Sequence, residues 1–486
     1  MPSARRTVRF TLLLSIWWAC IAPLHAQTQR LVFAHYMLAN RDHAPDDPTG
    51  ERDIAAYQRE IHQAQAIGVD GFALNAGGWF QEPRYIRRAS EMFEAARRLH
   101  TGFRLFFSAD MCCSNDAADV EDMVRRFANN PRYAPVYFRY RGKSVLSTFA
   151  GSAHGPKFWR NLLSDLEHGT NPSLRAAPCV RNLCPLAPAR SAPSSAPVPI
   201  EFVPAFFLGG ELPQRADIAA GLSSYRDIID GAFYWGIAGV PGLGHPPDQL
   251  PSSEAYAAAL HAAGKLYMAP ICLQFWGANA GRYYEYGGFA GMRALWSNAI
   301  DITHPEWIEI ITWNDFVEGT YVSPIANPIV DRSTTSTNIF PSHRGATQLL
   351  VFFISWYKTG HQPPIHDDAV YWAYRTQLTN ASTFATIKNF GPTGNVVYVT
   401  ANLTRPAKLR VSFGAQCVTK ELPAGSTDVQ IPIRAPGSAP HFELERGTSH
   451  LAKDTGNDVI RASDPMPNLY YSTGYMHDPE NRGARR

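Results

Sequence analysis

Short apolar runs alternate with longer amphipathic segments along the first three quarters of the chain. Eight runs have the length and composition of strands, at 31–37, 71–75, 102–110, 143–149, 200–207, 231–235, 265–271 and 307–313. Between them apolar residues recur at helical spacing, for example at 53–67, 88–99, 120–127, 158–166, 216–229 and 253–263. Repeated strand and helix units of this kind predict an α/β fold, a (β/α)8 TIM barrel.

A doubly wound open sheet is the alternative architecture, and periodicity alone does not separate the two. The Rossmann version requires a glycine-rich turn after the first strand. Here the first strand runs into the sequence HYMLAN at 35–40. The barrel has a further consequence, because its active site lies at the carboxyl ends of the strands.

Two regions depart from the repeat, which otherwise predicts a barrel over 27–375. Residues 169–199 are rich in Pro, Ala and Ser, as expected for an excursion between the fourth and fifth strands. Short alternating strands, such as 395–400, then predict a small antiparallel β domain over 376–446. The polar, turn-rich residues 447–486 are expected to form a C-terminal tail.

The N-terminus has the composition of a secretory signal peptide over residues 1–26. Three arginines precede an apolar run at 10–23, and a small-residue cleavage site follows at Leu24-His25-Ala26. An uncleaved anchor is the alternative, but the run is shorter than the ~20 residues that span a bilayer. We therefore expect a secreted protein, extracellular or periplasmic, without membrane association after cleavage.

The cysteines and the composition of the chain narrow the kinds of site and partner that we expect. An exported chain permits disulfides, and Cys179 and Cys184 bracket a short loop, which makes them the preferred pair. Neither CxxC pairs nor His at ligand spacing accompany the cysteines, so no metal site and no cofactor is predicted. A net charge of +3 is too small to favour nucleic acid as a partner. We expect a globular monomer.

The segment after the eighth strand carries the strongest chemical signal. Asp315 and Glu318 lie three residues apart there. Paired carboxylates are the minimal equipment for hydrolysing a glycosidic bond, since one donates a proton to the leaving oxygen while the other activates water. As structural residues they would need a cation or a helix to cap, and no Lys or Arg lies between Arg293 and Arg332. We predict that they are catalytic, although a distant cation could still pair with them.

Residues at the other strand ends would share the same rim of a barrel. Their amide, carboxylate and ring groups suit sugar hydroxyls and C–H faces. The predicted substrate-binding residues of this rim are His35, Asn75, Asp110, Trp235 and Trp276. Each has a structural alternative: a hydrogen-bonded plug for the histidine, a cap or loop brace for the Asn and Asp, and core packing for the tryptophans.

Six segments occur in the order found in one enzyme family. They are VFAHYM at 32–37, GVDGFALN at 68–75, LFFSADM at 105–111, STFAG at 147–151, VPAFF at 203–207, and 313–324. On these segments the chain resembles glycoside hydrolase family 71, the endo-α-1,3-glucanases called mutanases, over about residues 31–375. The C-terminal β region is outside this resemblance.

The resemblance implies a barrel that hydrolyses internal α-1,3-glucosidic bonds of α-glucan with inversion. The Trp-Asn-Asp-x-x-Glu motif of the family falls on Trp313, Asn314, Asp315 and Glu318. By this resemblance Glu318 is the general acid and Asp315 the general base. Trp313, Asn314 and Tyr321 are expected to contact the substrate.

The motif also departs from the family pattern. The family has Gly before the Glu and Ser-His after it, whereas this chain has Val317, Gly319 and Thr320. Glu-Gly-Thr is similar to the endo-α-mannosidase family 99, whose first acidic position is Glu. An endo-α-mannosidase or another α-glycan hydrolase, and a non-catalytic glycan-binding barrel, therefore remain as alternatives.

Overall fold

The computed structural model describes residues 30–40, 47, 49–112, 115–169, 196–208, 215–236, 249–277, 281–284, 286–324, 329–331, 338–379, 394–463 and 468–478. The predicted signal peptide, nearly all of the predicted excursion at 169–199 and the predicted Cys179–Cys184 pair lie outside these residues. Among the described helices none is long and apolar enough to cross a membrane.

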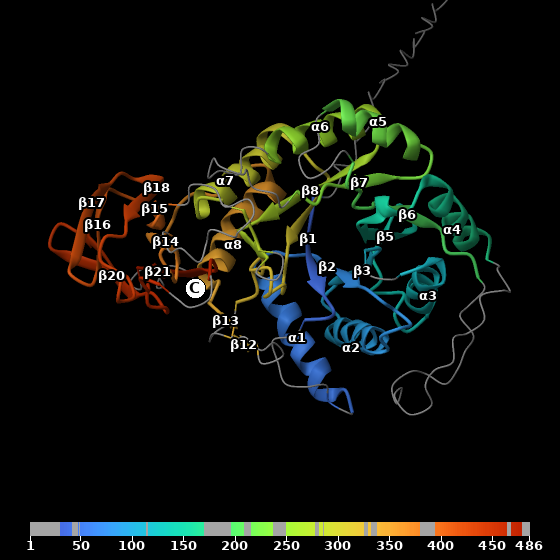
Figure 1. Ribbon diagram of the computed structural model, residues 1–486, viewed down its shortest axis with the longest axis horizontal. Coiled ribbons are helices and arrows are strands. Elements are labelled where there is room, and N and C mark those ends of the chain that lie inside the picture. The colour runs from blue at the N-terminus through green and yellow to red at the C-terminus, as the bar shows by residue number, and fades with distance from the viewer. Residues whose placement is uncertain are drawn as a thin grey trace, which may run out of the picture.

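Strands and helices alternate along the chain up to residue 359 (Figure 1). The first half contains β1 (Leu31–Met37), α1 (Glu51–Ala66), β2 (Gly71–Ala76), α2 (Arg84–Leu99), β3 (Arg104–Asp110), α3 (Ala117–Ala128), β4 (Arg139–Tyr140), β5 (Lys143–Phe149), η1 (Gly151–Ala153) and α4 (Pro156–His168). The second half contains β6 (Ile200–Phe202), α5 (Arg215–Tyr225), β7 (Gly231–Phe233), α6 (Gln249–Ala262), β8 (Leu266–Cys272), β9 (Phe275–Gly277), β10 (Arg282–Tyr284), α7 (Phe289–Ser297), η4 (Asn298–Thr303), β11 (Trp307–Ile311), β12 (Ile329–Asp331), β13 (Asn338–Phe340) and α8 (Arg344–Thr359).

One curled parallel sheet forms the centre of this region. Its strands pair in the order β5-β3-β2-β1-β11-β8-β7, with β6 parallel to β5 and the short β4 antiparallel to it. The α/β class is thereby confirmed. Seven of the eight predicted strands nearly match their observed bounds. The exception is 200–207, of which only Ile200–Phe202 is strand.

Alternate residues of the strands fill the inside of the curl with aromatic rings. The ring of Phe33 on β1 lies 4.9 Å from Phe106, 5.0 Å from Phe138 and 5.8 Å from Trp307. These contacts are tilted or edge-to-face, the geometry that aromatic pairs prefer. Their burial closes the inside of the sheet, so that substrate access is left to the ends of the strands.

The C-terminal part consists of two four-stranded antiparallel sheets. Their strands are β14 (Ala369–Arg375), β15 (Val396–Leu403), β16 (Ala407–Phe413), β17 (Gln416–Leu422), β18 (Gly425–Pro432), β19 (His441–Arg446), β20 (Ser449–Thr455) and β21 (Tyr471–His477). The orders are β18-β15-β14-β21 and β17-β16-β19-β20. A separate core joins the sheets, in which the rings of Trp372 and Phe442 stack at 4.2 Å.

The C-terminal strands extend beyond the predicted range of 376–446 on both sides. They begin at Ala369 and reach His477, so most of the predicted tail at 447–486 that the structure describes belongs to this β region. The physical reason is that β20 is an edge strand with mostly exposed side chains, which removes the apolar alternation. The strand β21 is buried but contains no Val, Ile or Leu.

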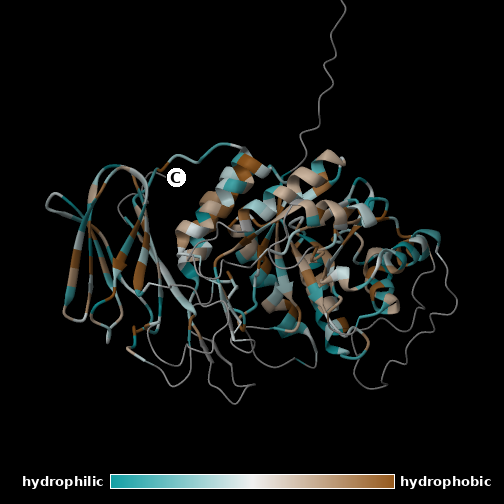
Figure 2. Ribbon diagram, turned by 45° about the horizontal axis from the view of Figure 1, so that its top comes forward, coloured by the Kyte–Doolittle hydropathy of each residue, from teal (hydrophilic) through white to brown (hydrophobic). Residues whose placement is uncertain are grey.

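The C-terminal sheets lie beside α8, at the left of Figure 1. Brown and teal residues alternate along the helices and the C-terminal strands, as expected for elements that are each buried on one side (Figure 2). The start of α8 approaches β21 without side chains between them, because a Cβ on Gly345 would lie 2.3 Å from the carbonyl oxygen of Gly474. The two parts therefore share a close contact.

Candidate active site

Asp315 and Glu318 lie on one tight turn after β11, at the carboxyl end of the curled sheet. Asp315 is only 7% exposed. Its backbone N–H donates to Thr312 Oγ1 at 2.8 Å, and its Oδ1 accepts the backbone N–H of Glu318 at 3.2 Å. The aspartate thus caps the turn that carries the glutamate, which holds the two carboxyl groups in a fixed relation.

The surroundings raise the pKa of both carboxyl groups, and that of Glu318 more strongly. Burial and then the negative charges of Asp315 and Asp110 raise the pKa of Glu318 well above its ordinary value. Burial also raises the pKa of Asp315, but backbone N–H groups and His35 oppose that rise. Within the described residues neither carboxylate pairs with a Lys or Arg. Glu318 is therefore suited to keep a proton that Asp315 gives up.

The turn is fixed from both sides by side chains outside it. Gln274, which follows β8, donates from Nε2 to the carbonyl oxygen of Gly319 at 2.9 Å. The hydroxyl of Tyr470 donates to the carbonyl oxygen of Val317 at 2.8 Å. Gly319 has φ of +65°, and a Cβ there would lie 2.6 Å from Gln274 Nε2. Glycine is therefore required by conformation and by space.

Three residues predicted to contact the substrate instead hold the loop in place. The side-chain amide of Asn314 bonds to the N–H of Met37 at 2.8 Å and to its carbonyl at 3.1 Å. Trp313 is fully buried, and its Nε1 donates to Glu60 Oε2 at 3.0 Å. Tyr321 is also fully buried, stacks on His343 at 3.8 Å and donates to the carbonyl of Pro341. Their substrate contact is not supported by these positions.

His35 lies inside the curl rather than on its rim. Its Nδ1 is 2.6 Å from Glu309 Oε1, and both side chains are fully buried. The edge of its ring meets the ring of Trp235 at 4.7 Å. Its carbonyl oxygen accepts the backbone N–H of Trp313 at 2.7 Å, two residues before Asp315. This arrangement fits the alternative of a hydrogen-bonded plug.

Of the remaining predicted rim residues, Asp110 is brought to the carboxylate pair. It ends β3, its Oδ1 accepts the N–H of Cys112 at 3.0 Å, and its charge acts on Glu318. Asn75 is the last residue but one of the neighbouring strand β2, lies opposite Ser108 and is buried. Both residues lie at the predicted carboxyl edge of the sheet.

The two predicted rim tryptophans lie in different surroundings. Trp235 follows β7 and packs on Phe149 and His35, with both ring centroids at 4.7 Å. Trp276 donates its backbone N–H to the carbonyl of Glu318 at 2.8 Å. Its side chain is buried in a cluster with Phe316 and Tyr470. Trp276 therefore belongs to the contact with the C-terminal sheets.

Sequence reasoning missed Asn40 and Gln274. Asn40 Nδ2 reaches Asp315 Oδ1 at 3.5 Å and the carbonyl oxygen of Asn314 at 3.4 Å. Gln274 carries the turn from the other side. Asn40 and Gln274 are polar residues that follow closely after a strand of the sheet. The rim residues were predicted from the same position, so the sequence could have indicated Asn40 and Gln274 as well.

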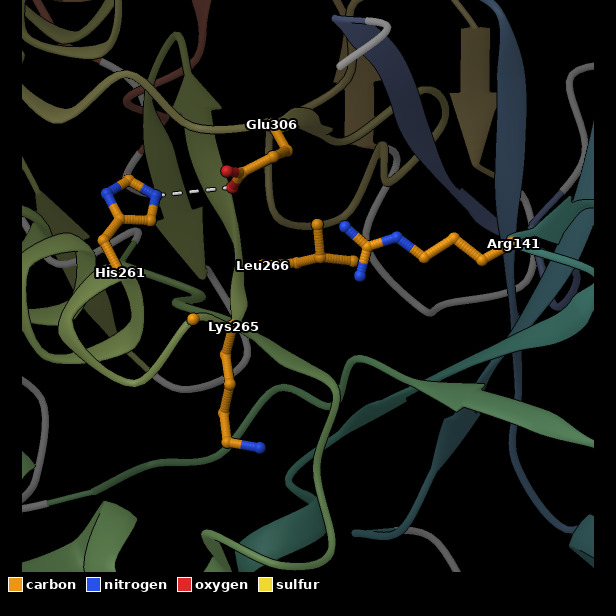
Figure 3. A pocket seen from close by; sticks show the side chains of 6 residues that line it. Arg141, His261, Lys265, Leu266 and Glu306 are labelled. Carbon is orange, nitrogen blue, oxygen red and sulfur yellow. Dashed lines mark hydrogen bonds and ion pairs between the residues drawn. The ribbon is translucent and has the colours of Figure 1, made fainter. Parts of the chain in front are cut away.

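A cavity of about 310 Å³ lies at the opposite end of the sheet (Figure 3). Arg141, Lys265 and Glu306 line it, and these residues precede β5, β8 and β11. Figure 3 shows His261 and Glu306 pointing toward each other, with Nε2 and Oε2 3.4 Å apart. The Nζ of Lys265 donates to the carbonyl of Ile229 at 2.6 Å. These hydrogen bonds hold neighbouring elements together at this end of the sheet. Asp315 and Glu318 lie at the other end.

The described residues contain one group of side chains with the spacing of metal ligands, Glu443, Glu445 and His450. It lies on β19 and β20, in the C-terminal sheets. Two of its members already bond to each other, since His450 Nδ1 is 2.8 Å from Glu443 Oε1. Arg410 lies 3.6 Å from Glu445. This group therefore has partners of its own and no connection with the carboxylate pair.

A curled parallel sheet with two carboxyl groups at its carboxyl edge is an arrangement that glycoside hydrolases use. The family model Glycosyl hydrolase family 71 matches residues 28–477. The chain belongs to this family, and it is a glycoside hydrolase. The match includes the C-terminal strands, which corrects the expectation that the resemblance ends near residue 375.

Two curated relatives share most of their length with the chain. It is 26% identical over 444 residues to a glucan endo-1,3-alpha-glucosidase of Schizosaccharomyces pombe, covering 89% of this chain and 91% of the relative. It is 24% identical over 448 residues to a mutanase of Penicillium rubens, covering 88% and 85%. Both are proteins to which this chain is similar.

Solved structures with a similar arrangement include two of the GH99 endo-alpha-mannosidase from Bacteroides thetaiotaomicron. Their TM-scores are 0.47 and 0.46, with 11% and 12% sequence identity. Each comparison covers 68% of this chain and 98% of the other. Likenesses of this size do not bear on the substrate.

Proposed function

We propose that this glycoside hydrolase cleaves internal α-1,3-glucosidic bonds of α-glucan, with Glu318 as general acid and Asp315 as general base. The observation that carries the proposal is the turn after β11. It holds a buried and a half-buried carboxyl group, Asp315 and Glu318, without a described cationic partner, and it raises the pKa of Glu318 more strongly than that of Asp315. The substrate is taken from the names of the two curated relatives.

In the proposed reaction Glu318 donates its proton to the glycosidic oxygen as the bond to the anomeric carbon breaks. Asp315 accepts a proton from water, whose oxygen forms the new bond on the opposite face of the sugar. The product is inverted at the anomeric carbon. Proton exchange with solvent then restores a protonated Glu318 and an ionised Asp315.

We further propose that the curled sheet is a closed (β/α)8 barrel. Contacts between β6 and β7 support closure. The N–H of Asp230 donates to the carbonyl of Phe202 at 2.9 Å, and that of Phe233 donates to Pro204 at 2.8 Å. Ala205 and Phe233 form a parallel bridge. A closed barrel would place strand ends from all sides around Asp315 and Glu318.

Two of the three residues that depart from the family pattern, Gly319 and Thr320, have structural roles, so they are not evidence for α-mannan as the substrate. Gly319 is required by its positive φ and by Gln274. The hydroxyl of Thr320 lies 2.9 Å from that of Thr312, within the same loop. The Glu-Gly-Thr sequence is therefore explained by loop packing without reference to the glycan.

Secretion is proposed on the basis of the predicted signal peptide at 1–26. The mature chain would begin near Gln27 and meet α-glucan outside the cell or in the periplasm. Expression with residues 1–26 present, followed by N-terminal sequencing of the exported protein, tests this proposal. Retention of the full chain in the cell would contradict it.

The substrate proposal is tested by incubating the purified mature protein with α-1,3-glucan and, separately, with α-mannan. New reducing ends are expected from the glucan alone. Asp315→Asn and Glu318→Gln serve as matched variants that keep side-chain size and remove the charge. Release from mannan only would replace the proposed substrate. Binding of glycan by the wild type without any release would favour the non-catalytic barrel.

A further inference from the structure

Phe207 is an exposed aromatic side chain at the active-site end of the sheet. The described residues contain four large apolar side chains that are exposed: Phe207 (39%), Ile302 (58%), Val351 (40%) and Val459 (45%). Phe207 alone among them is aromatic, and it alone follows a strand of the curled sheet at its carboxyl end. Single exposed apolar residues are common, so its surroundings decide whether it has a role.

The ring of Phe207 continues a row of aromatic contacts that leads into the site. It meets Phe149 at 5.5 Å, edge to face, and Phe149 meets Trp235 at 4.7 Å. Phe149 ends β5, and Trp235 follows β7. We call Phe207, Phe149 and Trp235 the aromatic shelf. Three neighbouring strands thus contribute one ring each to a row of contacts in which Phe207 is exposed, Phe149 is half-buried and Trp235 is buried.

Hydrogen bonds hold the backbone around Phe207 in place, so that its ring faces outward. Its N–H donates to Ser152 Oγ at 3.0 Å. The hydroxyl of Tyr256 donates to the carbonyl of Phe206 at 2.8 Å, and both of those side chains are buried. Leu208 on the other side is buried as well. Between two buried neighbours, Phe207 is directed to solvent.

The aromatic shelf and the carboxylate pair are connected through one residue. His35 on β1 contacts Trp235 of the shelf, and its carbonyl oxygen accepts the backbone N–H of Trp313, two residues before Asp315, at 2.7 Å. The strand β1 pairs directly with β11, which carries the catalytic turn, whereas the shelf strands β5 and β7 lie at the far ends of the pairing order. A glycan chain held at the pair therefore has an apolar surface farther along the same edge.

We propose that Phe207 binds a sugar ring of the glycan at a distance from the cleaved bond, with Phe149 supporting it. The axial C–H groups of a hexose present an apolar face that packs on an aromatic ring. This inference rests on the proposed function, since it assigns a binding position for the same substrate. Phe207 makes no contact with the reacting atoms, so it contributes to binding of long chains and leaves the chemical step unchanged.

The test compares Phe207→Ala and Phe207→Trp with Ile302→Ala, a control that removes an exposed apolar side chain from η4. Phe207→Ala should raise KM for long α-1,3-glucan about tenfold with kcat nearly unchanged. The shortest oligosaccharide that the wild type cleaves should show no change in KM. Phe207→Trp should restore the wild-type KM, and Ile302→Ala should match the wild type on both substrates.

An equal effect of Phe207→Ala on long and short substrates, or no effect on either, would overturn the proposal. Thermal melting of each variant separates these outcomes from misfolding. Should the wild type cleave no α-glucan, the proposed function fails, and retardation of wild type and Phe207→Ala in an α-1,3-glucan gel still tests binding. Equal retardation of the two proteins there would refute the role of Phe207.

Discussion

At the scale of single residues, Glu318 and Asp315 differ because their surroundings differ. Asp315 is buried and accepts backbone N–H bonds that favour its charge, whereas Glu318 is half-buried and the charges that act on it are those of other carboxylates. Carboxyl groups whose environments push their pKa values apart are suited to separate acid and base roles. The proposed roles of acid and base are therefore supported by local electrostatics.

Asp110→Asn should move the alkaline limb of the pH profile of kcat/KM to lower pH. The charge of Asp110 raises the pKa of Glu318, so its removal lets Glu318 lose its proton at lower pH. Asp301→Asn, which neutralises an exposed carboxylate on η4, is the matched control. An alkaline limb that stays in place in Asp110→Asn would show that Glu318 is not the acid.

Glu318→Gln should raise the melting temperature at neutral pH while abolishing activity. The pKa of Glu318 is raised in the folded state, so its stabilising effect is complete below about pH 4.5 and is lost as pH rises through the folded pKa. A glutamine at position 318 has no proton to lose, so the variant does not lose stability as the pH rises through this range. The gain over the wild type should be absent near pH 4 and grow toward neutrality, as thermal melting at several pH values would reveal. A variant less stable at every pH would contradict this account.

At the scale of elements, the turn that carries Asp315 and Glu318 depends on packing from both of its sides. Gly319→Ala should lower kcat by roughly 100-fold, because a Cβ would displace Gln274 or Tyr470 and shift the turn. Gly102→Ala is the control, since its φ is also positive at +77° but a Cβ there would meet nothing within 4 Å. Steady-state kinetics should therefore separate the two variants. Equal losses of kcat in the two variants would indicate that strain at a positive φ causes the effect, and not displacement of Gln274 or Tyr470.

The sequence predicted elements better than it predicted the direction of side chains. Buried parallel strands appear as apolar runs, so the strands of the curled sheet were found. The edge strand β20 lacks such a run and was missed. Beyond a strand end the alternation of faces no longer holds. Asp315 is therefore predicted from its chemistry alone, and its role stays a prediction, whereas Trp313 and Tyr321 are expected at the substrate but are buried.

At the scale of the whole molecule, the C-terminal part of the chain helps to hold the turn that carries Asp315 and Glu318 in place. Tyr470 bonds to the loop, and the N–H of Tyr471 donates to Gln274 Oε1 at 2.9 Å. The buried Arg375 on β14 donates from Nε to the hydroxyl of Tyr283 at 3.0 Å. These contacts join the two parts across a largely apolar cluster. The family match over residues 28–477 likewise includes both parts.

A chain that ends at residue 367, before β14, should be inactive and should aggregate. The truncation would expose the apolar surface of α8 and leave Gln274 without the partner that orients it toward Gly319. Size-exclusion chromatography and activity on α-1,3-glucan measure the two effects. A monodisperse truncated protein with wild-type kcat would show that the C-terminal sheets are not needed at the site.

The most direct test of the central claim is proton NMR of the first product released from an α-1,3-glucan oligosaccharide. An inverting reaction by Glu318 and Asp315 predicts that the β anomer appears first and then equilibrates. The variants Asp315→Asn and Glu318→Gln should release no product on the same timescale. Initial release of the α anomer, or release by either variant at the wild-type rate, would contradict the proposed mechanism.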